Sequence, residues 1–126
     1  MGFTIIDLAD KQKGLSVNFW NWHPTVELVR TIGVVDTERI ELMHQQCAGA
    51  VITEHEARQI ARGLQDGVLA RLQAGERVRL DLSTTAESDD GTLHRVPDAD
   101  KNYSATCEWL TQFAQFCMEC RGFRVL

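Results

Sequence analysis

Residues 103–126 constrain the fold of this chain more than any other segment, and they read YSATCEWLTQFAQFCMECRGFRVL. Apolar side chains recur there at spacings of three and four, which predicts an amphipathic helix. Ser104 or Thr106 is suited to cap the start of this helix, and Gly122 is suited to end it. An amphipathic helix must bury its apolar face against another layer, so we expect the chain to fold as a globular domain.

Alternating and β-branched runs predict strands, and capping signals predict further helices. The expected strands are residues 3–7, 15–20, 77–82 and 123–126. The expected earlier helices are residues 24–31, which begin at Pro24, residues 37–47, and a long helix that begins at the T-x-x-E capping box of Thr53. These elements predict one α+β domain over residues 1–126, with three to four helices packed on a small, mainly antiparallel sheet.

Two glycines, Gly63 and Gly67, lie inside the long predicted helix, where each costs about 1 kcal/mol relative to alanine. Either another element packs closely against them or the helix breaks near Asp66, and close packing is the preferred interpretation. The expected core consists of residues on the inward faces of the elements: Ile5, Val17, Phe19, Val26, Val29, Ile40, Met43, Ile60, Leu64, Val68, Leu72, Leu80, Leu110, Phe113, Ala114 and Cys117.

The composition is that of a soluble globular protein, with 44% hydrophobic and 25% charged residues. No apolar run approaches the length of about 20 residues that spans a bilayer, and the first residues lack the pattern of a signal peptide. Four cysteines without an export signal favour reduced thiols and a cytoplasmic location. The net charge of −5 argues against nucleic acid as a partner, because phosphate binding depends on clustered lysine and arginine.

The excess negative charge is concentrated in residues 81–100, which contain six acids and one base. Such a stretch is either a solvated loop or a surface that attracts a basic partner. The first functional hypothesis is therefore a non-catalytic binding domain that meets a basic protein partner, with electrostatic attraction setting the association rate. The candidate acidic binding residues are Asp89, Asp90, Asp98 and Asp100.

An aromatic cluster, Trp20, Trp22 and His23, precedes Pro24 in a predicted loop. Indole side chains bury a large area and keep an N–H donor, so these residues are candidates for a binding hot spot or the rim of a ligand pocket. The alternative is that they anchor the predicted hairpin to the first helix.

Cys117 and Cys120 form a C-x-x-C pair at the end of the last predicted helix, where the helix dipole disfavours a thiolate and hence redox catalysis. His44 and Cys47 have the same spacing on an earlier helix. The second hypothesis is that the two pairs form a zinc site with three cysteines and one histidine. The alternative is that the cysteines are buried as small hydrophobic residues, with no cofactor.

No catalytic motif is present, and local spacing does not assemble a nucleophile, a base and an oxyanion donor. His55 and Glu56 lack the second histidine of a metalloprotease motif, because position 59 is Gln59. The third hypothesis is an enzyme whose site is assembled from distant residues, including His23 and Glu27.

Residues 17–29 (VNFWNWHPTVELV) and 102–123 (NYSATCEWLTQFAQFCMECRGF) resemble a family of small, uncharacterised bacterial proteins. The resemblance extends over most of the chain and implies no activity and no catalytic residues. The chain is also similar in size and charge to the immunity proteins of bacterial toxin systems, which leaves toxin immunity as an alternative function.

Overall fold

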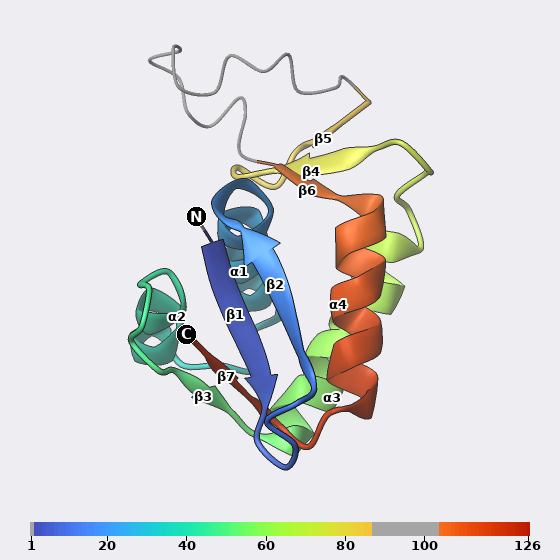
Figure 1. The fold of residues 1–126 in the computed structure, drawn as a ribbon. Helices are drawn as coiled ribbons and strands as arrows, with labels where there is room; N and C mark the ends of the chain where they lie inside the picture. The colour runs from blue at the N-terminus through green and yellow to red at the C-terminus, as the bar shows by residue number, and fades with distance from the viewer. Residues whose placement is uncertain (1, 87–103) are drawn as a thin grey trace.

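The computed structural model describes residues 2–86 and 104–126, which form four α-helices and two antiparallel sheets (Figure 1). This architecture confirms the predicted α+β class, although two small sheets replace the single expected sheet. No helix of the described part is both long enough and apolar enough to cross a membrane.

The first sheet has the strand order β2-β1-β7-β3, and every neighbouring pair is antiparallel. Its strands are β1 (Gly2–Asp7), β2 (Gly14–Asn18), β7 (Phe123–Val125) and β3 (Val51–Ile52). The C-terminal strand β7 is therefore inserted beside β1, and β2 occupies an edge of the sheet. Alternation along β1 places Phe3 and Ile5 in the core, while Thr4 is exposed.

The second sheet has the order β5-β4-β6 and consists of β4 (Arg77–Arg79), β5 (Thr84–Thr85) and β6 (Ser104–Thr106). The predicted strand over residues 77–82 was too long at its C-terminal end. Leu82 takes a left-handed conformation with φ 71°, and Leu82 N donates to the Arg79 carbonyl oxygen at 2.8 Å. The chain therefore turns into β5 after Arg79.

The four helices are α1 (Phe19–Ile32), α2 (Thr37–Met43), α3 (Glu54–Leu64) and α4 (Cys107–Glu119), and α3 continues as a π-helical turn, η1 (Gln65–Leu69). Capping signals placed three of the helix starts. The Thr53 capping box forms with both of its hydrogen bonds, and the side chains of Asp36 and Thr106 cap α2 and α4.

The predicted start of the first helix at Pro24 was wrong, because α1 begins five residues earlier. The Asn18 side chain accepts a hydrogen bond from Asn21 N and caps the helix at Phe19. Pro24 lies within α1 near its N-terminus, where its missing N–H removes a single backbone hydrogen bond. The aromatic cluster therefore lies on a helix and not in a loop.

The second predicted helix ends at Met43 and not at Cys47, which has φ 60°.

The two glycines inside the long predicted helix have different surroundings. A methyl group on Gly63 would lie 2.8 Å from the Ile32 side chain, so the expected close packing is present there. No atom lies within 4 Å of the equivalent point at Gly67, where α3 instead gives way to the π-helical turn.

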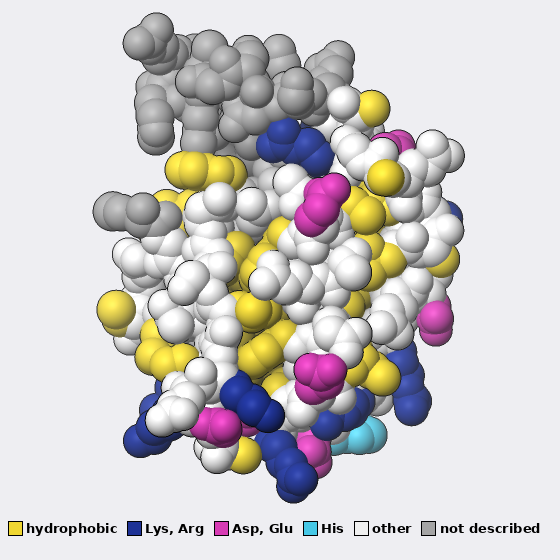
Figure 2. Space-filling model, turned by 45° about the vertical axis from the view of Figure 1, so that its right-hand side comes forward, with side chains coloured by type: hydrophobic (Ala, Val, Ile, Leu, Met, Phe, Trp, Pro, Cys, Tyr) yellow, Lys and Arg dark blue, Asp and Glu magenta, His cyan; other side chains and the backbone are white. Residues whose placement is uncertain are grey.

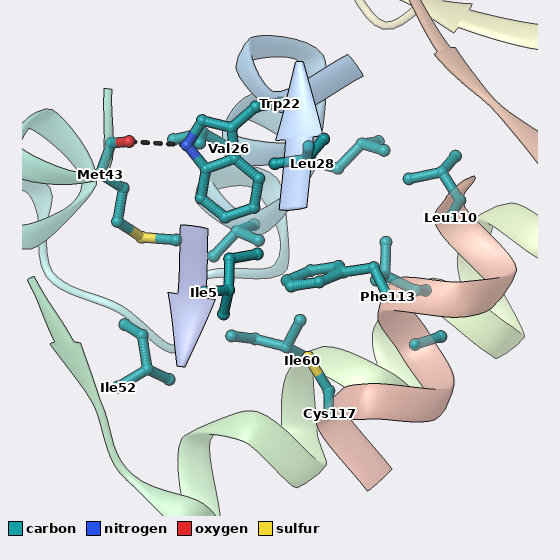
Figure 3. Close-up of a cluster of buried hydrophobic side chains, with 14 of the residues drawn as sticks. Ile5, Trp22, Val26, Leu28, Met43, Ile52, Ile60, Leu110, Phe113 and Cys117 are labelled. Carbon is teal, nitrogen blue, oxygen red and sulfur yellow. Dashed lines mark hydrogen bonds between the residues drawn. The ribbon is translucent and has the colours of Figure 1, made fainter. Parts of the chain in front are cut away.

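One hydrophobic core lies between the first sheet and helices α1, α3 and α4 (Figure 3). Its largest fully buried side chains include Trp22, Phe113 and Phe123. Most of the predicted core residues are buried, but Phe19, Val68 and Leu80 are only partly buried. Leu80 falls in the turn that replaces the end of the predicted strand.

Candidate functional site

The predicted aromatic cluster joins elements of the core. Trp22 is 0% exposed, and its Nε1 donates to the Met43 carbonyl oxygen at 2.7 Å (Figure 3). Its ring packs edge-on against Phe113, with the centroids 5.7 Å apart. Trp22 therefore anchors α1 to α2 and is not available to a ligand. Trp20 is partly buried in the first turn of α1.

His23 belongs to a polar network between α1 and α2. Its Nδ1 atom lies 2.7 Å from His44 Nδ1, and His44 Nε2 lies 2.7 Å from Glu27 Oε2. Arg30 donates to Glu27 at 3.2 Å and to Glu41 at 2.9 Å. His23 and Glu27 are one turn apart on α1, so both reach the same side of α2.

Burial and the charge of His44 lower the pKa of His23, and the Glu27 carboxylate offsets part of this change. Burial acts to raise the pKa of Glu27, but hydrogen bonds from His44 and Arg30 outweigh it and the pKa is lowered. Glu27 therefore stays ionised and holds the His44 ring by a charge-assisted hydrogen bond.

This network contains a base, His44, and the carboxylate that orients it, Glu27. Four cavities formed by described residues are lined by other side chains, and none of these four has His23 or Glu27 in its lining. His23 and Glu27, the two residues of the hypothesised enzyme site, are thus connected through His44. Their contacts join α1 to the end of α2.

The four residues of the hypothesised zinc site do not converge. Cys117 and Cys120 are buried, with Cys120 Sγ donating to the Cys117 carbonyl oxygen at 3.9 Å, while Cys47 is exposed. His44 is engaged by Glu27 and His23. Within residues 2–86 and 104–126, no three His, Cys, Asp or Glu side chains are grouped as metal ligands.

Burial raises the pKa of the Cys117 and Cys120 thiols, and for Cys117 the raised value lies well above the ordinary one. Neutral thiols in an apolar interior pack as hydrophobic side chains. The predicted acidic binding residues Asp89, Asp90, Asp98 and Asp100 all lie outside the described residues.

Sequence reasoning missed a groove between β2 and α4. Its volume is about 470 Å³, and its apolar lining comes from Leu15 and Phe116. Polar side chains along α4 complete the lining: Glu108, Thr111, Gln112, Gln115 and Glu119. Figure 2 shows this side of the molecule, with hydrophobic side chains gathered between polar atoms and separate acidic side chains along the face.

Within residues 2–86 and 104–126, the two carboxylates of the groove have no basic partner. Glu119 accepts a hydrogen bond from Gln115 at 2.6 Å, and across the described ranges neither Glu108 nor Glu119 forms an ion pair. By contrast, Glu27 and Glu56 on other faces are each bound by an arginine. The negative charge of the groove is thus not neutralised from within the described part of the chain.

The other wall of the groove is the open edge of the first sheet. Thr4 exchanges backbone hydrogen bonds with Leu126, so its N–H and C=O point towards β7. Ser16 is paired with Thr4, and in an antiparallel ladder its own N–H and C=O must then point away from β1. No strand of the described part covers this side of β2.

Within the described part of the chain, the arrangement combines an apolar floor, carboxylates without ion-pair partners and a strand edge that no other strand covers, which are features found at protein-recognition surfaces. Comparisons with known proteins add no relative: no protein-family model matches the chain, and neither the curated proteins nor the solved structures contain a significant match.

Proposed function

We propose that this protein is a non-catalytic binding domain that receives a basic segment of a partner protein in the groove between β2 and α4. The observation that carries the proposal is the pairing of an apolar lining, Leu15 and Phe116, with two carboxylates that lack ion-pair partners in the described ranges, Glu108 and Glu119. All four cysteines are free thiols, which supports placing this activity in a reducing compartment such as the cytoplasm.

The negative charges of Glu108 and Glu119 at the two ends of the groove favour lysine and arginine in the partner. Exposed carboxylates contribute mainly to the rate and specificity of association, and their effect decreases as salt screens it. The apolar lining supplies the area that a partner side chain covers on binding. Binding to the groove should therefore require both an apolar residue and basic residues.

The proposal is tested with a series of labelled peptides of about twelve residues that share a central leucine and differ in lysine content. Fluorescence anisotropy measures their affinity at low and high salt. We expect affinity to rise with lysine content, and the double variant Glu108→Gln with Glu119→Gln to weaken binding by about tenfold.

A matched control removes two carboxylates elsewhere. Glu38 and Asp66 are exposed on α2 and η1, outside the groove. The double variant Glu38→Gln with Asp66→Asn carries the same net charge as the groove variant and should bind as the unaltered protein does. Equal losses in both double variants, or affinity that is independent of lysine content, would show that the groove is not the site.

A further inference from the structure

We propose that the partner binds as an added β-strand on the edge of β2, an inference that rests on the proposed function of the groove. The strand would lie between β2 and α4 and would extend the order of the first sheet to partner-β2-β1-β7-β3. Main-chain hydrogen bonds then supply part of the affinity, and alternate side chains supply the specificity.

The backbone of β2 is set up for this addition. The register pairs Ile5 with Leu15 and Thr4 with Ser16. The backbone N–H and C=O of Thr4 are hydrogen-bonded to Leu126 and so point away from β2. The N–H and C=O of its pairing partner Ser16 therefore point to the open edge, and those of Gly14, two residues away, do the same. A partner residue opposite Ser16 could exchange two hydrogen bonds with it, as in any antiparallel pair.

The same register assigns the side chains of the partner. Ser16 is exposed on the outer face of the sheet, whereas Leu15 and Val17 lie on the inner face. Directly opposite residues share a face, so the partner residue opposite Leu15 would point inward beside Phe116. That residue should be apolar, and its two neighbours should be tolerant of substitution.

The positions of the carboxylates set the length of the segment. Glu108 lies in the first turn of α4 and Glu119 is its last residue, so they are separated by about 16 Å along the helix. An extended chain covers this distance in about five residues, which is also the length of β2. The partner is therefore an extended segment with a central apolar residue and basic residues near both ends.

The test uses a labelled peptide of about nine residues with a central leucine, a lysine two residues away on each side and serine elsewhere. N-methylation of the two residues next to the leucine removes donors that would face β2. N-methylation of the leucine itself alters an N–H that would point away from β2 and serves as the matched control. We expect the first modification to weaken binding by at least about tenfold and the second to leave it nearly unchanged.

A variant of the protein tests the same contact from the other side. Ser16→Pro removes the outward N–H without removing a ladder bond to β1, because proline is tolerated on sheet edges. Ser16→Ala keeps that N–H and should bind normally, while Ser16→Pro should bind at least about tenfold more weakly. Circular dichroism checks that Ser16→Pro folds, and the methylated peptides decide the question with unaltered protein if it does not.

The outcomes separate this inference from the proposed function. If the unmodified peptide binds and every methylated form binds equally well, the groove is a binding site but strand addition is wrong. If the unmodified peptide does not bind at about millimolar concentration, the proposed function fails together with the inference. If affinity is lost on methylation of the residues next to the leucine and in Ser16→Pro, but not in the matched controls, the result supports both the proposed function and strand addition.

Discussion

The Nδ1 atoms of His23 and His44 lie 2.7 Å apart, with the two rings stacked and their centroids 4.9 Å apart. A hydrogen bond between two ring nitrogens needs one donor and one acceptor, so only one of these atoms can carry a proton. His44 Nε2 faces the Glu27 carboxylate at 2.7 Å and acts as a donor there. The three side chains therefore form a continuous chain of hydrogen bonds between α1 and the end of α2.

Acid should weaken the protein through His23. Its pKa is lowered from 6.5 in the folded state, first by burial and then by His44. As the pH falls through about 6.5, the unfolded chain takes up a proton that the folded protein resists, so this stabilisation is complete above that pH and is lost below it. The free energy of unfolding, measured with urea from pH 8 to pH 5, should decrease by at most about 1.4 kcal/mol per pH unit from this group.

Two histidine variants isolate that effect. His23→Gln removes the titrating ring and should flatten the dependence of stability on pH between about 7 and 5. His55 is exposed on α3, and His55→Gln should leave the dependence as it is in the unaltered protein. An unchanged slope in His23→Gln would assign the acid sensitivity to other groups.

Glu56 should stabilise the protein through Arg39, which joins α2 to α3. The two Arg39 terminal nitrogens donate to the two Glu56 oxygens at 2.7 Å and 2.5 Å, and this contact lowers the pKa of Glu56 to about 2. Glu56→Gln keeps a side chain that can complete the capping box but removes the charge, and should cost on the order of 2 kcal/mol at pH 7.

The pH dependence of the free energy of unfolding tests whether the charge of Glu56 causes this effect. The stabilisation by Glu56 is present above its unfolded pKa of about 4.5 and is lost as the pH falls towards 2, so the difference between Glu56→Gln and the unaltered protein should vanish there. Glu54 has a side chain that is 52% exposed, and Glu54→Gln should change stability by less than about 0.5 kcal/mol. A constant difference at all pH values would mean that packing, and not charge, accounts for the effect of Glu56→Gln.

Capping residues in the sequence predicted the start of a helix correctly where a single side chain determines the local conformation. Thr53 and Asp36 each cap the helix that follows, because a short polar side chain satisfies the free N–H groups of the first turn. The same logic misplaced α1, since Pro24 was assigned to the first helical position when Asn18 makes the actual cap.

The candidate sites depend on contacts that local signals do not specify. His44 reaches His23 across 21 residues of sequence only because α2 folds back against α1. The groove exists because β7 pairs with β1 on one side and leaves β2 as an edge on the other, and this strand order is set by long-range pairing. The signal that could have indicated the groove was the exposed row of Glu108, Gln112 and Gln115 on a helix whose opposite face is apolar.

Two glycine variants should change stability in opposite directions. Gly67→Ala places a methyl group in open space at a helical position and should stabilise the protein by up to about 1 kcal/mol. Gly63→Ala brings a methyl group to 2.8 Å from the Ile32 side chain, and this overpacking should outweigh the helix propensity and cost about 1 kcal/mol. Thermal unfolding of both variants measures the difference.

A second substitution tests whether Ile32 is the cause. Ile32→Ala removes the Cδ1 and Cγ1 atoms that lie 2.8 Å from the added methyl group, so the double variant Gly63→Ala with Ile32→Ala should be more stable than the two separate changes predict. Purely additive changes would show that the loss at Gly63 arises elsewhere.

The four thiols should react in the order of their exposure. Cys47 is exposed and Cys107 is partly buried, whereas Cys117 and Cys120 are buried and their pKa values are raised, so the reactive thiolate is least available there. Mass spectrometry of the native protein treated with iodoacetamide should find Cys47 modified first. Cys117 and Cys120 should react only under conditions that unfold the protein.

The same thiols decide the zinc hypothesis. Because Cys117 and Cys120 are enclosed in the core and His44 is held by Glu27, added zinc should neither slow the modification of the exposed Cys47 nor raise the unfolding temperature. Protein purified without chelator should contain less than about a tenth of an equivalent of zinc by elemental analysis, since a structural site would bind zinc tightly at neutral pH. A stoichiometric zinc content, with all of His44, Cys47, Cys117 and Cys120 protected together, would require a fold that brings the end of α2 next to the end of α4.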